Sequence, residues 1–239
     1  MILPACRRST AVVLSLCLLV VGCLDSSRGP SPQAHITSRS CSLGIPGVIL
    51  EEGTPVEGMM ITLTVSVRTN SSTDSLDVTG DEAFLEAFNS ARMVAGTSLY
   101  APLGERSVMV ETDYNASLVG RSGGAALALL MTCAANGTVP REGITVSAGV
   151  RSDGSLVGVA HLPAKCAAVL DAGLHELWIA EEDAQVITWE ERQDPVTGQV
   201  RRVQRDLPVA EACSGIRVRT ARNISELAHG MLSPPRQEH

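Results

Sequence analysis

The chain has 239 residues, 44% of them hydrophobic, so it is long enough and apolar enough to bury the core of one globular domain. Its formal net charge is −7 at pH 7, and this acidity argues against nucleic-acid binding, which requires a basic surface. Lysine and arginine together number 19, yet Lys165 is the only lysine.

The first 22 residues have the pattern of a targeting segment. Arg7 and Arg8 form a positive start, and the apolar run at 11–21 is too short to span a bilayer comfortably. A small residue and then Cys23 follow this run, which resembles a bacterial lipoprotein signal cleaved before an acylated cysteine. We therefore expect a signal peptide at 1–22, lipidation of Cys23, and a membrane-anchored protein in the cell envelope, outside the cytoplasm. An ordinary secretory signal or an uncleaved anchor is the alternative.

Four cysteines lie beyond the expected lipidation site: Cys41, Cys133, Cys166 and Cys213. In an oxidising compartment they permit two disulfides in three connectivities, and the sequence does not choose among them. Buried free thiols are an equally good interpretation, since an unpaired cysteine packs like a small hydrophobic residue.

Composition divides the rest of the chain into three parts. Residues 23–54 are rich in serine, proline and glycine and lack helical or strand periodicity, which predicts a flexible tether. The folded domain is expected at 55–232, and a disordered tail at 233–239.

Within the expected domain, strands and helices interleave. Alternating apolar residues at 61–67 predict a half-buried strand, and Asp81 stands at the N-cap position of a helix whose apolar residues recur over 84–95. The segment 123–135 is apolar on nearly every face and predicts a buried helix. Charged residues at 188–207 flank a turn-forming sequence, which is typical of an exposed hairpin. Further strands are expected at 107–112, 144–150, 156–159, 176–180 and 215–218, and further helices at 164–172 and 223–232. This order indicates a single α/β or α+β domain.

Residues 120–124 match the pattern G-x-S-x-G. The pattern places Ser122 at a tight turn before the N-terminus of the buried helix, where its hydroxyl is exposed. The free N–H groups of that helix end are then aimed at an oxyanion formed on an attacked carbonyl. Ser122 is therefore the candidate nucleophile, although a short glycine and serine pattern also occurs in structural turns.

A serine needs a base to become nucleophilic, and Lys165 is the candidate. A lysine can act as a base only when it is neutral, which at its ordinary pKa of about 10.4 is true of roughly one molecule in 2,500 at pH 7. Burial lowers that pKa, and the residues at 166–170 are apolar. Because arginine stays protonated at any accessible pH, the single lysine is the place to expect a role that arginine cannot fill; the alternative is a lysine that codon bias left by chance.

Four stretches together resemble the proteolytic domain of Lon peptidases. They are Leu-Asp-Val-Thr-Gly at 76–80, the turn at 120–124, the segment from Gly154 to Leu-Pro-Ala-Lys at 162–165, and Asp-Ala-Gly at 171–173 leading into Leu-Trp-Ile at 177–179. With the last expected helix, they extend over 59–232. The resemblance implies that family's fold, a mixed sheet with packed helices in one domain, and the activity of a serine peptidase.

The resemblance also implies roles for individual residues. Ser122 becomes the nucleophile of a Ser–Lys dyad, and Lys165 the base that later returns the proton to the leaving amine. Ser147 stands where Lon-like enzymes place a threonine that hydrogen-bonds the lysine, so it is expected to support Lys165. The turn and the oxyanion site are expected in the backbone of Gly120, Arg121 and Gly123.

The chain departs from the family at several points. Val119 replaces the acidic residue that many Lon enzymes carry three positions before the serine, and His161 stands where a glycine is usual. The sequence contains no G-x-x-x-x-G-K-[ST] motif, so we expect no coupled ATPase. The expected protein is an ATP-independent endopeptidase that cleaves peptides or unfolded segments and needs no cofactor or metal ion. Lon-like domains also form homo-oligomeric rings, which is a further implication.

Two other functions fit parts of the same pattern. A serine esterase would use Ser122 with His161 or His175 in a triad with an aspartate, and would tolerate Lys165→Arg. A lipoprotein that keeps the fold but binds rather than cuts would not be labelled at Ser122 by serine-directed probes.

Overall fold

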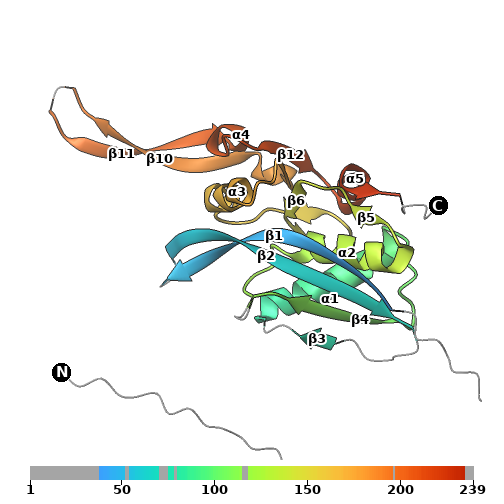
Figure 1. The fold of residues 1–239 in the computed structure, drawn as a ribbon. Coiled ribbons are helices and arrows are strands. Elements are labelled where there is room, and N and C mark those ends of the chain that lie inside the picture. The colour runs from blue at the N-terminus through green and yellow to red at the C-terminus, as the bar shows by residue number, and fades with distance from the viewer. Residues whose placement is uncertain are drawn as a thin grey trace, which may run out of the picture. The chain divides into compact units, whose positions relative to one another are not determined.

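A computed structural model describes residues 38–51, 54–69, 75–77, 80–114, 118–195 and 197–234. The first part of the fold is a four-stranded sheet in the order β1-β2-β4-β3 (Figure 1). Its strands are β1 (Ser38–Glu51), β2 (Thr54–Arg68), β3 (Ser75–Asp77) and β4 (Ser107–Thr112). β2 pairs with β1 and with β4 in antiparallel register, whereas β3 and β4 are parallel. The strand expected at 61–67 is thus the second half of β2.

The tether expected at 23–54 is wrong for its second half, because residues 38–51 form β1. Leu43 and Ile45 are buried on one face of this strand, where they contribute to the hydrophobic core. Gly44 and Pro46 interrupt the apolar pattern and conceal the strand in the sequence. Both are tolerated because β1 is an edge strand, which needs sheet partners on one side only.

The expected signal peptide, Cys23 and the residues up to 37 lie outside the described part of the chain, as do residues 235–239 of the expected tail. Ser233, at the start of that tail, instead belongs to a short strand. Among the described residues, no helix is long and apolar enough to cross a membrane.

Two helices form the centre of the larger hydrophobic core. α1 (Glu82–Thr97) packs on α2 (Gly124–Asn136), and α2 packs on β1 and β2 (Figure 1). Asp81 caps α1 as expected, since its side chain accepts the N–H of Phe84. The buried helix expected at 123–135 is confirmed, because residues 124–135 of α2 are all buried. α2 ends at Gly137, whose φ of 75° is left-handed.

A second sheet has three parallel strands in the order β12-β9-β6. These are β6 (Ile144–Ser147), β9 (Glu176–Ala180) and β12 (Arg217–Ala221), with α3 (Leu162–Asp171) between β6 and β9 in the chain and α5 (Ile224–Met231) after β12. Because the strands are parallel, their carboxyl ends meet at one edge of the sheet. Two short pairs complete the fold: β5 (Val139–Pro140) with β13 (Leu232–Ser233), and β7 (Gly149–Val150) with β8 (Leu156–Val157).

The hairpin expected at 188–207 is confirmed. β10 (Gln185–Gln193) pairs with β11 (Val200–Pro208), and the N–H of Asp194 donates to the carbonyl of Gln199 at 2.8 Å across the turn. The short helix η1 (Glu181–Asp183) connects β9 to the hairpin, and α4 (Val209–Ala212) follows it. In Figure 1 the hairpin extends away from both sheets.

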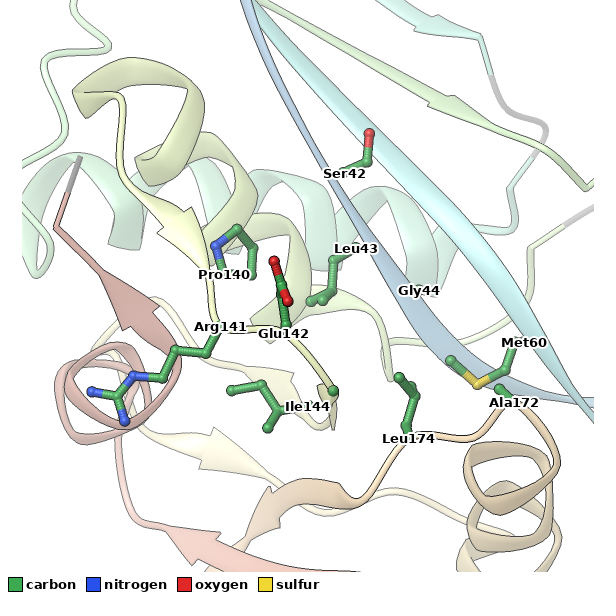
Figure 2. A pocket seen from close by; sticks show the side chains of 11 residues that line it. Ser42, Leu43, Gly44, Met60, Pro140, Arg141, Glu142, Ile144, Ala172 and Leu174 are labelled. Atoms are coloured by element: carbon green, nitrogen blue, oxygen red, sulfur yellow. The ribbon is translucent and has the colours of Figure 1, made fainter. Parts of the chain in front are cut away.

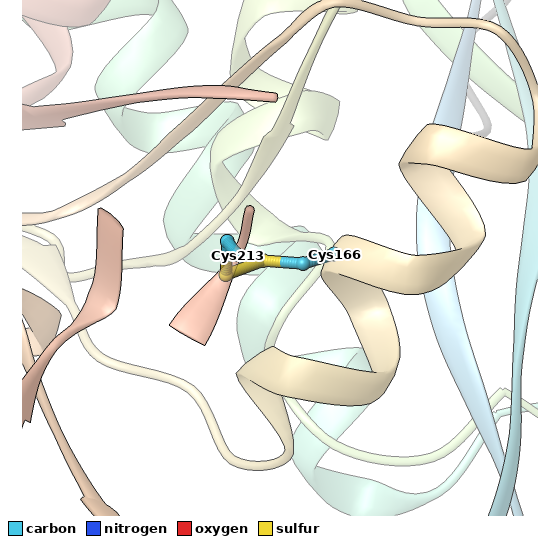
Figure 3. Close-up of a disulfide and its surroundings, with 2 residues drawn as sticks. All are labelled: Cys166 and Cys213. Carbon is cyan, nitrogen blue, oxygen red and sulfur yellow. A yellow bond between two sulfur atoms is a disulfide. The ribbon is translucent and has the colours of Figure 1, made fainter. Parts of the chain in front are cut away.

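A disulfide joins Cys166 of α3 to Cys213, with Cα atoms 5.4 Å apart (Figure 3). This cross-link is one of the pairings that the sequence left open, while Cys41 and Cys133 are free thiols. It lies in a second, smaller cluster of buried residues: Leu162, Cys166, Val169, Leu177, Ile179, Val209 and Cys213. The described residues thus belong to one mixed α/β domain, built from several sheets rather than from one.

Candidate active site

Lys165 lies near the start of α3 and is almost completely buried, with 5% of its surface exposed. Burial lowers the pKa of its amine from 10.5 to about 8, while the negative charge of Asp183 acts in the opposite direction. At pH 7, about one such lysine in ten is neutral, against roughly one in several thousand for an exposed lysine. The expectation that burial lowers this pKa is confirmed.

A close approach between α3 and β2 contributes to this burial. A Cβ atom on Gly58 of β2 would fall onto the carbonyl oxygen of Ala164, so the two elements can meet only because position 58 is glycine. Cys166, the residue after Lys165, forms a disulfide with Cys213. The segment that carries the lysine is therefore held by packing and by a covalent bond.

Asp183 is a candidate site residue that the sequence analysis missed. Its carboxylate accepts the N–H of Val159 at 2.8 Å, and the neighbouring Glu182 carboxylate accepts the N–H of Gly158. Burial raises the pKa of Asp183, and the hydrogen bond from Val159 opposes that rise. η1 thus fixes the loop that leads into α3 and places a negative charge near Lys165. The acidic run directly after the buried strand β9 was the only signal of it in the sequence.

Ser122 lies in the turn before α2 and is half-buried. The turn begins at Gly120, whose φ of 83° is left-handed and therefore suits glycine. The N–H of Gly124 donates to the carbonyl of Arg121 at 3.0 Å and closes the turn around Ser122. The side chain of Arg121 is exposed and lies 3.8 Å from Glu86, a pairing that contributes little at a wet surface.

The backbone N–H groups of Ser122 and Gly123 donate no hydrogen bond to any of the described residues. Gly123 is buried, and the nearest atoms to a Cβ placed on it are the Cδ1 atoms of Ile45 and Leu63. These two donors therefore lie beside the serine, next to apolar side chains and at the positive end of α2. Such an arrangement can stabilise an oxyanion.

Ser147 ends β6, is 1% exposed, and has a side-chain oxygen without a hydrogen-bond partner among the described residues. An unpaired buried hydroxyl costs about 1–3 kcal/mol, and the Thr138 hydroxyl is likewise buried and unpaired among the described residues. The next residue, Ala148, accepts the N–H of Ala125 at 3.1 Å. The end of β6 is therefore joined to the first turn of α2.

The carboxyl edge of the parallel sheet links the two halves of the candidate site. The chain leaving β6 meets the first turn of α2, just after Ser122, and the chain leaving β9 forms η1, which carries Asp183 near Lys165. Ser147 and Ile179 are paired at this edge. Within the described residues, however, the Ser122 hydroxyl and the Lys165 amine form no hydrogen bond with each other.

The two histidines of the esterase alternative are both exposed. His175 precedes β9, and its N–H donates to the carbonyl of Gly143 at 3.0 Å, which places it at the amino end of the parallel sheet, opposite Ser147. His161 starts α3 with a left-handed φ of 62°, a conformation that a glycine would adopt more easily. His175 thus lies away from Ser147, whereas His161 lies one helical turn before Lys165, whose N–H donates to the His161 carbonyl at 3.2 Å.

A cavity of about 390 Å³ lies at the other end of β6, away from Ser147 (Figure 2). Leu43, Met60, Ile144 and Leu174 supply its apolar walls, and neither candidate catalytic side chain lines it. In the described part of the chain, no cluster of three or more His, Cys, Asp or Glu side chains is arranged to hold a metal ion.

A scan against models of known protein families finds none that matches this chain, and a search of curated proteins likewise finds no match.

Proposed function

We propose that this protein is a serine endopeptidase in which Lys165 activates Ser122. The observation that carries the proposal is the buried Lys165, whose pKa is lowered to about 8. Within the described residues Lys165 forms no ion pair, although the charge of Asp183 acts on it, and burying a lysine in this way is costly. The chain uses arginine at every other basic position. A neutral amine in apolar surroundings is what a lysine general base requires.

The proposed reaction is an acyl transfer through a covalent intermediate. Neutral Lys165 takes the proton of the Ser122 hydroxyl as the oxygen attacks the scissile carbonyl, and the N–H groups of Ser122 and Gly123 stabilise the oxyanion. Protonated Lys165 then donates to the leaving amine, which leaves an ester on Ser122. Lys165, again neutral, then takes a proton from water, and this water hydrolyses the ester. The unpaired hydroxyl of Ser147 accepts a hydrogen bond from the lysine and orients it.

We further propose a Lon-like proteolytic domain that works without ATP on peptides or unfolded segments. The interleaved strands and helices are compatible with that fold. The Cys166–Cys213 disulfide supports an oxidising compartment, in agreement with anchoring of the protein outside the cytoplasm through Cys23.

The test compares cleavage of an unstructured protein, without ATP, by the wild type, Ser122→Ala and Lys165→Arg. Ser152→Ala serves as the matched control, because Ser152 is an exposed serine in a loop. We expect both site variants to lose at least a thousandfold in kcat, since arginine keeps the charge but cannot accept a proton. The control should keep wild-type activity.

Each alternative function gives a different result in this assay. Full activity of Lys165→Arg would refute the dyad and favour the esterase mechanism, in which His161→Ala or His175→Ala is inactive instead. A wild-type protein that neither cleaves nor reacts with a fluorophosphonate at Ser122 would be a binding module.

A further inference from the structure

Asp81 connects the start of α1 to the start of the Ser122 turn, 39 residues further along the chain. One of its carboxylate oxygens, Oδ1, accepts the N–H of Phe84 at 2.8 Å, which is the helix cap. Both oxygens accept the N–H of Gly120, each at 3.1 Å. Its own backbone N–H donates to the carbonyl of Leu118 at 3.1 Å.

The bond to Gly120 exceeds what helix capping requires. Asn223 caps α5 in the ordinary way, since its side chain accepts the N–H of Glu226 at 2.9 Å. Among the described residues, that side chain makes no bond to a second element. Besides capping α1, the carboxylate of Asp81 therefore also binds the turn that carries Ser122.

Packing is sparse at the residue where that turn begins, Gly120. No atom lies within 4 Å of the place where a Cβ on Gly120 would be, Val119 is 68% exposed, and Arg121 is exposed as well. From Gly123 onward the chain is buried. Gly120 is therefore held by the hydrogen bonds of Asp81, whereas Arg121 is held by its close approach to Gly149 and by the bond from Gly124.

We infer that Asp81 is a positioning residue that fixes the Ser122 turn, so that the serine hydroxyl and the N–H groups of Ser122 and Gly123 keep one orientation. This inference rests on the proposed function. A site whose donors are already oriented avoids reorganisation when the oxyanion forms, and a misplacement of about 1 Å can cost a hundredfold in rate.

The hydrogen bonds, rather than the negative charge, account for this role. A carboxylate close to the oxyanion site does not help a developing negative charge. An asparagine offers an acceptor oxygen at the same distance from the backbone, so Asp81→Asn keeps both the cap and a bond to Gly120. A serine still caps a helix, but it is one atom shorter and has a single oxygen, so Asp81→Ser keeps only the cap.

The experiment uses the full chain and four variants: Asp81→Ser, Asp81→Asn, Asp81→Ala and the control Asn223→Ala. We expect Asp81→Ser to keep the thermal stability of the wild type within a few degrees and to lose at least tenfold in kcat on an unstructured protein, with KM within twofold. Asp81→Asn should restore kcat to within twofold of the wild type. Asp81→Ala and Asn223→Ala should both lose stability, and Asp81→Ala should lose more because it also loses the bonds to Gly120. Only Asp81→Ala should lose kcat.

Hydrogen exchange of residues 118–124 gives a readout that does not depend on activity. Exchange there should become at least tenfold faster in Asp81→Ser than in the wild type and should not change in Asn223→Ala. If Asp81→Ser keeps both wild-type exchange and wild-type kcat, the inference is overturned while the peptidase stands. If the wild type neither cleaves nor reacts with a fluorophosphonate, the peptidase proposal fails. Hydrogen exchange then still tests Asp81: unchanged exchange at 118–124 in Asp81→Ser would show that Asp81 does not fix the turn.

Discussion

The two halves of the candidate site are held in opposite ways. The Ser122 turn begins at the surface, beside the exposed Val119, and its constraints are hydrogen bonds. Lys165 is buried, its helix packs against Gly58, and the next residue is in a disulfide. The difference suits the proposed chemistry, because a nucleophile must be reached by a substrate, whereas a lysine base must be kept from water to stay neutral.

Removal of the disulfide should produce the largest difference between the Lys165 segment and the Ser122 turn. A cross-link that spans 47 residues stabilises a protein by about 4 kcal/mol in the loop-entropy account. We expect the Cys166→Ala/Cys213→Ala variant to lose most of that in urea unfolding and to lose activity, because the segment carrying Lys165 is released. Hydrogen exchange at 118–124 should not change, and Cys41→Ala, which removes a free thiol, is the control. Equal loosening of both regions would contradict the distinction.

Lys165→Met should abolish activity and yet stabilise the fold. The pKa of Lys165 falls from 10.5 in the unfolded chain to about 8, so the unfolded chain binds its proton more tightly. The wild type is therefore penalised by about 3 kcal/mol at pH 7, and its stability should rise as the pH increases from about 8 to 10.5.

Urea unfolding at several pH values measures this effect. The Lys165→Met variant should gain up to about 3 kcal/mol at pH 7 and lose the rise at higher pH, while Ser122→Ala should stay within about 0.5 kcal/mol of the wild type. A Lys165→Met variant less stable than the wild type at pH 7 would show that the lysine is not penalised by burial.

Substituting alanine at either of two glycines should have smaller effects on stability and kcat, and the two positions form a matched pair. Gly120 in the serine turn and Gly173 after the lysine helix have left-handed φ values of 83° and 72°, and neither has an atom near the position of a Cβ. Alanine at either position should therefore cost a similar amount, about 1–2 kcal/mol. Only Gly120→Ala should also lower kcat, by about tenfold, because it disturbs the turn. Equal kcat values for the Gly120→Ala and Gly173→Ala variants would show that the serine turn is no more important for activity than the end of the lysine helix.

Asp183→Asn should produce the smallest change, a shift in pH dependence. The negative charge of Asp183 raises the pKa of Lys165, so its removal lowers that pKa further and leaves more neutral lysine at pH 7. The acid limb of the kcat profile should move to lower pH, while asparagine still accepts the N–H of Val159. Glu181→Gln, at an exposed acid of the same short helix, should not move the profile. A shift toward higher pH would contradict the assigned sign.

Much of the fold could be predicted where local patterns are strong. The cap at Asp81, the uniformly apolar helix at 123–135 and the strand at 176–180 all have signals within a few residues. β1 could not be predicted in this way, because an edge strand tolerates the proline and glycine that make the segment look like a tether.

The site was predictable only in part, for a related reason. Ser122 and Lys165 have local signals, a glycine-rich turn and a single lysine. The contributions of Asp183 and of the second bond of Asp81 arise from contacts between residues far apart in the chain, 24 and 39 positions respectively, so no local pattern reveals them. The choice of Cys213 as the partner of Cys166 likewise depends on the folded arrangement.

Whether Lys165 is the base for Ser122 is best tested by the pH dependence of Ser122 acylation by a fluorophosphonate, measured as a second-order rate from pH 5 to 10. The rate should rise to a plateau with an apparent pKa of about 8, the value at which buried Lys165 becomes neutral. In Lys165→Arg the rate should be at least a hundredfold lower and should lack this transition. A rate that does not depend on pH, or an arginine variant that reacts as the wild type does, would show that Lys165 is not the base for Ser122.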